Sequence, residues 1–194
     1  RDYFQRALEP NPDNPVVLGN LALACQHEGA LSESVDHYRR ALTLDSDNAH
    51  LHTNLAQALL LAENYPDGWA EFEHRLSDPV IAGVLENLPG EPWSGESLGG
   101  KTILLQAEQG LGDIIQFVRY AAKLSDQGAR VLLAGPGRLA HLLSEFEALA
   151  GYIDAAGPMP FADYHAPLMS MPHILKCGVI GGGEAYLSVD PSAV

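Results

Sequence analysis

Hydrophobic residues in the first 76 positions recur every three or four residues, which is the spacing of one face of an α-helix. This pattern repeats with an offset of 34 residues, because "YFQRALEPNPDN" at 3–14 aligns with "HYRRALTLDSDN" at 37–48 and "NLALACQHEG" at 20–29 aligns with "NLAQALLLAE" at 54–63. Small residues fall where two helices must approach closely, and Gly29 or Asn64 marks a turn within each unit. Each unit is therefore predicted to be a helical hairpin.

The period and the pattern resemble the tetratricopeptide repeat (TPR), in which neighbouring hairpins stack into a superhelix. The resemblance covers the second helix of one repeat (1–14), one whole repeat (15–48) and a degenerate last repeat (49 to about 76). In that last repeat Gly68 and Arg75 stand where small residues are expected in the second helix, as suits a terminal unit.

Asn20 and Asn54 occupy equivalent places on the first helix of their repeats, and in TPR proteins this helix lines the concave side. An asparagine side chain both donates and accepts hydrogen bonds, so stacked asparagines can bind the backbone of an extended protein or peptide partner. This arrangement is similar to that in the repeats of O-GlcNAc transferases. Simple solvation of both residues remains the alternative, and His27, His50 and His52, on or near the same surface, are expected to be solvated.

Residues 77–100 hold three prolines and five glycines without a sustained period, so they are predicted to connect two domains, at 1–76 and 101–194. Trp93 within this segment is expected to be buried because an exposed tryptophan is costly.

Continuous apolar runs at 101–107 and 129–135 predict two buried strands, and a third short strand is expected at 152–156. Helical patterns at 113–128 and 137–150 separate them. This β-α-β-α-β order predicts a parallel sheet with helices on both faces, so the whole chain is expected to combine α and α/β parts. Ligands of such sheets bind beyond the carboxyl ends of the strands, where the turn "AEQGLGD" at 107–113 lies.

This glycine-rich turn does not match a nucleotide site. A dinucleotide site needs a third glycine where Ile115 stands and an acidic residue where Gly135 and Pro136 follow the second strand, and no GxxxxGK motif occurs. Asp113 at the start of the helix would repel a phosphate group. It suits either an ordinary N-cap or a base at the mouth of a cleft, with Gly110 and Gly112 allowing a second molecule to approach.

The run "PWSGESLGGKTILLQAEQGLGDIIQFVRYAAKLSDQGARV", preceded by "GWAEFEHRL" and followed by "DYHAPLMSMP", resembles bacterial proteins in which TPRs precede a glycosyltransferase-like domain. That domain is similar to the heptosyltransferases and, more distantly, to the O-GlcNAc transferase group. The resemblance implies a Rossmann-like N-terminal half of a GT-B fold at 101–194, with Asp113 as the base for the acceptor hydroxyl. It further implies that Glu108, Gln109 and Gln116 line the acceptor side, next to Gly110 and Gly112 of the turn. His165 and Ser170, at a polar strand end, are expected to face the same cleft, and a structural role for both is the alternative.

Asp163, His165 and Ser170 invite a catalytic-triad interpretation, but no nucleophile elbow surrounds Ser170 and the spacing indicates a strand that enters a helix. We therefore reject the triad. The segment "GVIGGGEAY" at 178–186 is predicted to be a flexible loop.

The formal net charge is −14, with 16 acidic against 5 basic residues in 1–100 and 9 against 6 in 101–194. Such a chain is repelled by nucleic acid and by anionic lipid, so neither is an expected partner. The two cysteines, Cys25 and Cys177, form neither a disulfide framework nor a metal-ligand spacing and indicate a reducing compartment. No apolar run is long enough to span a membrane, and a cytoplasmic location is expected.

Transferases of this class bind the acceptor mainly on the first Rossmann-like half and the nucleotide-sugar donor mainly on the second. Since the chain stops at Val194, it is expected to be a fragment that is inactive alone, holds no cofactor and requires the missing half for the donor. The expected partners are a polypeptide on the repeats and a sugar or protein acceptor in the cleft. The alternative is a non-catalytic scaffold for protein–protein interaction.

Overall fold

The computed structural model describes residues 1–177 and 185–187. Within them the chain divides into two compact units, which we call the repeat unit (Arg1–Ala82) and the α/β unit (Gly83–Lys176). Most of the loop predicted at 178–186 lies outside the described residues.

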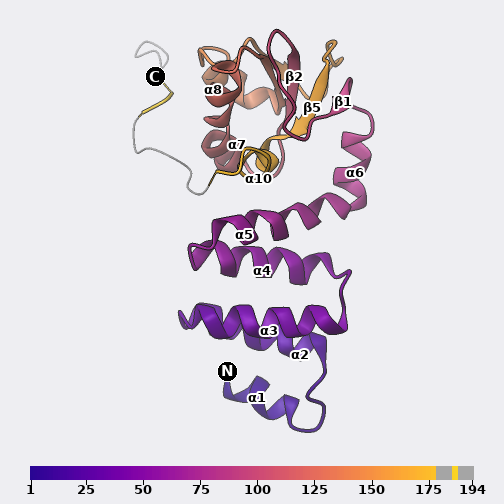
Figure 1. The fold of residues 1–194 in the computed structure, drawn as a ribbon, viewed down its shortest axis with the longest axis vertical. Coiled ribbons are helices and arrows are strands. Elements are labelled where there is room, and N and C mark those ends of the chain that lie inside the picture. The colour runs from indigo at the N-terminus through magenta and orange to yellow at the C-terminus, as the bar shows by residue number, and fades with distance from the viewer. Residues whose placement is uncertain (178–184, 188–194) are drawn as a thin grey trace. The chain divides into compact units, whose positions relative to one another are not determined.

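The repeat unit is built from helices packed side by side in the order of the chain (Figure 1). They are α1 (Asp2–Leu8), α2 (Pro15–His27), α3 (Leu31–Leu44), α4 (Ala49–Leu61), α5 (Tyr65–Phe72) and the 3-10 helix η1 (Glu73–Ser77). The prediction of helical hairpins is confirmed.

The hairpins begin at caps that recur with the repeat. The Asn14 side chain accepts hydrogen bonds from the backbone N–H groups of Val16 and Val17 at 3.1 and 3.2 Å. Asn48, 34 residues later, accepts two equivalent bonds of 3.1 Å at the start of α4. These bonds satisfy N–H groups that have no partner inside the helix, so the repeat in sequence fixes where α2 and α4 begin.

Large and small side chains interlock in the core between these helices. Tyr38 and Leu18 are fully buried, and the alanines at 22, 41 and 58 leave room for them. The last repeat departs from this scheme, because Arg75 is buried there. Its guanidinium lies 4.4 Å from the centre of the Phe72 ring and pairs with Glu73 at 2.8 Å. Its charge is thus compensated by neighbours in the sequence.

The segment predicted to connect the domains contains a helix that the sequence analysis missed. Helix α6 (Pro79–Leu85) begins after Asp78, whose carboxylate accepts a 2.8 Å bond from the N–H of Val80. Asp followed by Pro is a helix-start signal that was available in the sequence. Trp93 in the same segment is 4% exposed and donates from Nε1 to the carbonyl of Glu96 at 2.9 Å, which confirms that it is buried.

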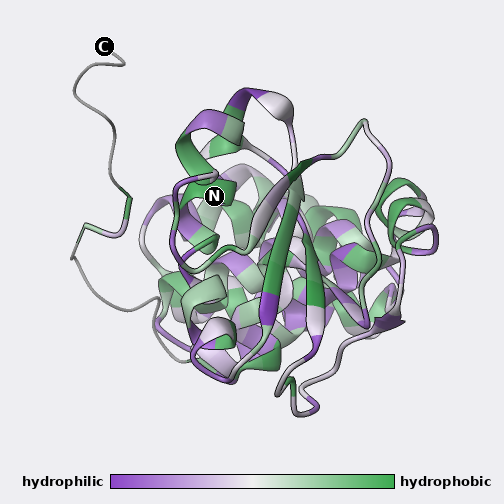
Figure 2. Cartoon of the chain, turned by 90° about the horizontal axis from the view of Figure 1, so that it is seen from above, coloured by the Kyte–Doolittle hydropathy of each residue, from purple (hydrophilic) through white to green (hydrophobic). Residues whose placement is uncertain are grey.

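The α/β unit contains a five-stranded sheet in which every strand pair is parallel, in the order β1-β5-β2-β3-β4. Its central strands are largely green, that is hydrophobic, in Figure 2. The strands are β1 (Glu91–Pro92), β2 (Thr102–Gln106), β3 (Arg130–Gly135), β4 (Gly151–Asp154) and β5 (Tyr164–Pro167). The predicted parallel sheet is confirmed, and with the hairpins it gives the expected α + α/β fold.

The helices of this unit are shorter than the sequence predicts. They are α7 (Leu111–Phe117), α8 (Tyr120–Ser125), η2 (Gly137–Leu139), α9 (Ala140–Leu143), η3 (Leu168–Ser170) and α10 (Met171–Ile174). Helix α8 packs on β3 and α9 on β4. Beyond Leu143 the expected helix gives way to turns, in which Phe146 donates its backbone N–H to the Leu143 carbonyl and Leu149 donates to the Phe146 carbonyl.

One cluster of hydrophobic residues on the sheet is covered by connecting segments and not by a helix, whereas the sequence predicted helices on both faces. Leu104 and Leu132 pack there with Ala162, Leu88 and Met159, which come from connecting segments. The chain returns from β4 to β5 through 155–163 without forming a helix, and this explains the difference.

Candidate functional site

A cleft of about 550 Å³ lies at the carboxyl ends of β2, β3 and β4. The last residue of each of these strands lines it: Gln106, Gly135 and Asp154. Open α/β sheets bind ligands at this edge, because loops from neighbouring strands meet there. The other polar side chains on its wall are those of Gln109 and Arg138.

Gln106 carries a buried acceptor on the wall of the cleft. Its side chain is 7% exposed, and Nε2 donates to the carbonyl of Ala107 at 3.0 Å. Oε1 has no hydrogen-bond partner among the described residues. A buried acceptor without a partner costs about 1–3 kcal/mol, and a turn of the Gln106 side chain toward the cleft would let a ligand hydroxyl recover that energy.

Gln109 is exposed and adopts a left-handed backbone conformation with φ of 59°. A residue with a Cβ pays about 1–2 kcal/mol for this conformation, which glycine adopts freely. Such strain is concentrated at functional sites, where it fixes the direction of a loop. The strained residue therefore sets the path of the loop that leads from β2 into the cleft wall.

Arg138 and Asp154 bring opposite charges to the cleft, and neither was predicted as a site residue from the sequence. Arg138 is exposed on η2, directly after β3. The Asp154 carboxylate accepts a 3.0 Å bond from the N–H of Ala156. Asp154 ends β4 and Arg138 follows β3, two strands that the sequence predicted, so the rule that ligands bind beyond strand ends could have found them.

Tyr152 fixes this side of the cleft through its hydroxyl, which donates to the carbonyl of Pro136 at 2.8 Å. Burial and, secondly, the Asp154 carboxylate raise the pKa of Tyr152. The hydroxyl consequently stays protonated and remains a donor at neutral pH.

Asp113 lies at the third position of α7, and not at the N-cap as the sequence suggested. Gly110 is the N-cap, and its N–H donates to Asp113 Oδ2 at 3.1 Å. The helix begins earlier because Leu111 and Gly112 join its first turn. Asp113 is half-buried and does not line the cleft itself, but its bonded neighbour Gly110 does.

The other predicted residues of this turn have different surroundings. Glu108 Oε1 accepts a 3.3 Å bond from the N–H of Met169, which ties the β2–α7 loop to η3. Gln116 is exposed on α7. At Gly112 an added Cβ would meet no atom within 4 Å, so packing within the chain does not require glycine there.

His165 and Ser170 are buried and do not line the cleft. His165 Nδ1 lies 3.2 Å from the carbonyl of Pro89, an acceptor that fixes the proton on this nitrogen. His165 thereby anchors the segment before β1 to β5. Its structural role accounts for its burial without a ligand.

Asp163 has a structural role at the opposite end of the sheet. Its carboxylate accepts bonds from the N–H of Thr102 at 2.8 Å and from Lys101 Nζ at 3.1 Å. The Thr102 N–H and then Lys101 lower the pKa of Asp163. Asp163 precedes β5 whereas Ser170 follows it, so the two lie at opposite ends of that strand. This separation agrees with the rejection of a catalytic triad.

In the repeat unit, Asn20 is exposed on α2 and Asn54 is half-buried on α4. Their role in binding a peptide stays a prediction. His27 and His50 are exposed, but the expectation that His52 is solvated is wrong, since its side chain is buried.

His52 is buried because the last repeat surrounds it with partners. Its Nδ1 lies 2.5 Å from Glu71 Oε2 and its Nε2 lies 2.9 Å from the carbonyl of Ser46. Its ring stacks on that of His74 with 3.5 Å between the ring centres.

Comparison with known proteins adds to this geometry. Residues 24–61 match the TPR repeat family. Repeats of this family generally mediate protein–protein interaction. None of the helices in the described residues combines the length and hydropathy that a membrane crossing requires.

A curated relative, Protein FlbA of Caulobacter vibrioides, is 29% identical over 118 residues, which are 59% of this chain. The match covers 20% of that protein, so the chain spans about a fifth of the length of the relative. Among solved structures, a mutant O-GlcNAc transferase of Thermobaculum terrenum matches with a TM-score of 0.38 and 15% identity. That match covers 80% of this chain and 37% of the transferase chain.

Proposed function

We propose that the chain is part of a TPR-linked glycosyltransferase, in which the repeats bind a polypeptide and the α/β unit binds the acceptor of a transferred sugar. The acceptor enters the cleft at the carboxyl ends of β2, β3 and β4. The donor, a nucleotide sugar, binds in a part of the full-length protein outside residues 1–194.

The observation that carries the proposal is the polar lining of the cleft, which includes Gln106, whose buried Oε1 has no partner among the described residues. A polyhydroxyl compound offers several donors and acceptors at short spacing, and the cleft wall offers the matching set. The amides of Gln106 and Gln109 both donate and accept, Arg138 donates and Asp154 accepts. Few but well-placed polar groups of this kind fix the orientation of a small ligand.

Asp113 is the proposed base for the acceptor hydroxyl, as the resemblance to heptosyltransferases implies. Its Oδ2 accepts the N–H of Gly110, whose backbone lines the cleft. A carboxylate has further acceptor sites beyond that one bond, so it can also take a proton from a hydroxyl. Positioned bases of this kind contribute about 10²–10⁴-fold to turnover.

The polypeptide is proposed to lie along Asn20 and Asn54. Both are at equivalent places on α2 and α4 and are at least partly accessible. Two asparagines give only a short binding surface, so the affinity for the polypeptide is expected to increase with each further repeat. A scaffold without catalysis is the competing function, and the match of residues 24–61 to the TPR repeat family is compatible with it.

Turnover in the full-length protein tests the catalytic part of the proposal. The protein is incubated with a panel of nucleotide sugars, and release of the nucleoside diphosphate is measured for the parent, Asp113→Asn and Asp126→Asn. Asp126 is exposed at the end of α8 and provides the same substitution away from the cleft. We expect Asp113→Asn to reduce kcat at least about 100-fold while Asp126→Asn leaves it unchanged. Equal turnover of the two variants would remove Asp113 as the base, and no turnover in the parent would favour the scaffold.

A further inference from the structure

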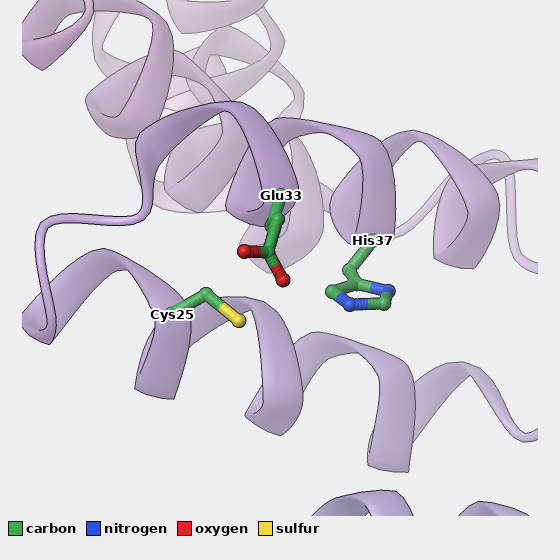
Figure 3. Close-up of side chains that lie close together, drawn as sticks. All are labelled: Cys25, Glu33 and His37. Atoms are coloured by element: carbon green, nitrogen blue, oxygen red, sulfur yellow. The ribbon is translucent and has the colours of Figure 1, made fainter.

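Three side chains of the types that bind transition metals lie together in the complete repeat. Cys25 comes from α2, whereas Glu33 and His37 come from α3. In Figure 3 the thiol, the carboxylate and the imidazole face the same space between the two helices. Glu33 and His37 are four residues apart, so they lie on one face of α3. One ligand atom from each residue lies within 4.8 Å of those of the other two.

The chemistry of this set fits zinc better than it fits magnesium or calcium. Zn²⁺ takes thiolate, imidazole and carboxylate ligands at about 2.0–2.3 Å in a tetrahedron, which places ligand atoms about 3.5 Å apart. The ligand atoms must therefore approach one another by up to about 1 Å when the ion binds. Glu33 is exposed and His37 half-buried, so both side chains can rotate toward the fully buried Cys25.

We propose that Cys25, Glu33 and His37 bind a Zn²⁺ ion that joins α2 to α3, with a water molecule as the fourth ligand. The site lies in the repeat unit and does not depend on the proposed transferase function. It adds a metal-dependent clamp to the repeat that carries Asn20.

Arg1 is a positively charged neighbour of the proposed site. Its guanidinium pairs with Glu33, and also with Glu28 at 3.3 Å. A Zn²⁺ ion that takes Glu33 as a ligand competes with Arg1 for that carboxylate, and Arg1 keeps Glu28 as its partner. Removal of the guanidinium should therefore strengthen metal binding.

A second cluster, His52, Glu71 and His74, provides a contrast within the same unit. The two imidazole rings are stacked at 3.5 Å with an angle of 4° between their planes. The lone pairs of their nitrogens therefore lie in parallel planes and do not converge on one ion. Both nitrogens of His52 also already face acceptors, Glu71 Oε2 and the Ser46 carbonyl.

The metal binds the thiolate form of Cys25, so binding at the proposed site releases the thiol proton.

Titration with Co²⁺ tests the site, because a thiolate bound to Co²⁺ gives a charge-transfer band in the near ultraviolet that carboxylate and imidazole do not give. The reduced 194-residue chain is titrated with Co²⁺, and Zn²⁺ is then added to displace it. We expect a saturable band that Zn²⁺ abolishes. Cys25→Ser should lose the band, and Cys177→Ser, the matched control, should keep it.

Surface variants keep the test decisive if Cys25→Ser does not fold. His37→Ala and Glu33→Gln should each weaken Co²⁺ binding at least about tenfold, Arg1→Ala should strengthen it, and His52→Ala should leave it unchanged. The proposal is overturned if no band forms. It is equally overturned if the band is lost in Cys177→Ser, or if His37→Ala and Glu33→Gln bind Co²⁺ as tightly as the parent.

Discussion

The repeat unit and the α/β unit differ in what surrounds their buried polar side chains. In the repeat unit His52 and Arg75 find partners within about twenty residues, such as Glu71 and Glu73. Among the described residues, buried polar atoms without a partner occur in both units, at Gln26, Ser34 and Tyr38 in the repeats and at Gln106 in the α/β unit. Of these four residues only Gln106 lines the cleft that three separate strands build.

This difference has a physical origin in how each region is assembled. A repeat is a local structure, whose caps, turns and interlocking side chains lie within 34 residues and recur in the next unit. The cleft joins loops that follow β2, β3 and β4, which are distant in the sequence. The following substitutions compare matched positions in the two regions.

Glycines with a left-handed backbone should show the largest difference. Gly90 in the α/β unit has φ of 82°, and an added Cβ would lie 2.7 Å from backbone atoms of Ala162 and Asp163. Gly29 in the repeat unit has φ of 78°, but an added Cβ would meet nothing within 4 Å. Gly90→Ala is expected to cost about 2–4 kcal/mol and Gly29→Ala about 1 kcal/mol.

Amide hydrogen exchange can measure both costs, since it reports the opening free energy of each region separately. Equal costs for the two substitutions would show that the backbone around Gly90 yields to the added methyl group.

Helix caps should have the next largest effect. Asn14→Ala and Asn48→Ala each remove two bonds to backbone N–H groups at a helix start. Each should cost about 1 kcal/mol of unfolding free energy, measured by chemical denaturation. Asn54→Ala is the control within the same unit and should change stability by less than about 0.5 kcal/mol. A similar loss for all three would contradict the repeated cap.

Left-handed residues other than glycine distinguish strain that serves a ligand from strain that does not. Gln109 has φ of 59° beside the cleft, and Glu63 has φ of 61° after α4. Replacement of either by glycine should raise stability by up to about 1 kcal/mol, because glycine avoids the strain at a small entropic cost. Only Gln109→Gly should weaken the binding of a sugar to the cleft, as measured by NMR titration. If Glu63→Gly weakens sugar binding as well, the loss does not come from the backbone conformation at the cleft.

The smallest effect concerns pH. The pKa of Asp163 is lowered in the folded state, so its contribution to stability is present above its ordinary pKa of about 3.9 and is lost as pH falls through the folded pKa. Asp163→Asn should therefore be less stable than the parent from about pH 5 to 7, and the difference should shrink below about pH 4. Denaturation midpoints across this range measure it. A difference that persists at pH 2 would assign the effect to packing and not to charge.

The sequence predicted the fold better than the site, for reasons that particular residues make clear. The repeat of Asn14 at Asn48 and the apolar runs of β2 and β3 depend on local patterns, which the sequence displays directly. Helix α6 was missed because Gly83 and the later prolines hid its short pattern. Arg138 and Asp154 were missed because the predicted site was centred on the turn after β2, although both lie at or beyond the carboxyl ends of predicted strands.

His52 was predicted to be solvated, but Glu71 and His74 from later in the chain bury it. The burial of a polar side chain depends on tertiary partners, and helical spacing alone does not indicate them. Gly110 and Gln109 were predicted at the site and do line the cleft, because they lie in the loop directly after β2.

The central claim is that the two units bind two different kinds of ligand, and one NMR experiment on the 194-residue chain tests it directly. Side-chain amide resonances of Gln106, Gln109, Asn20 and Asn54 are followed during separate titrations with a panel of monosaccharides and with an extended, uncharged peptide. The account predicts that a sugar of the panel shifts the two glutamine amides and that the peptide shifts the two asparagine amides. Shifts of the asparagines with the sugars, or no response of Gln106 and Gln109 to any of them, would contradict the account.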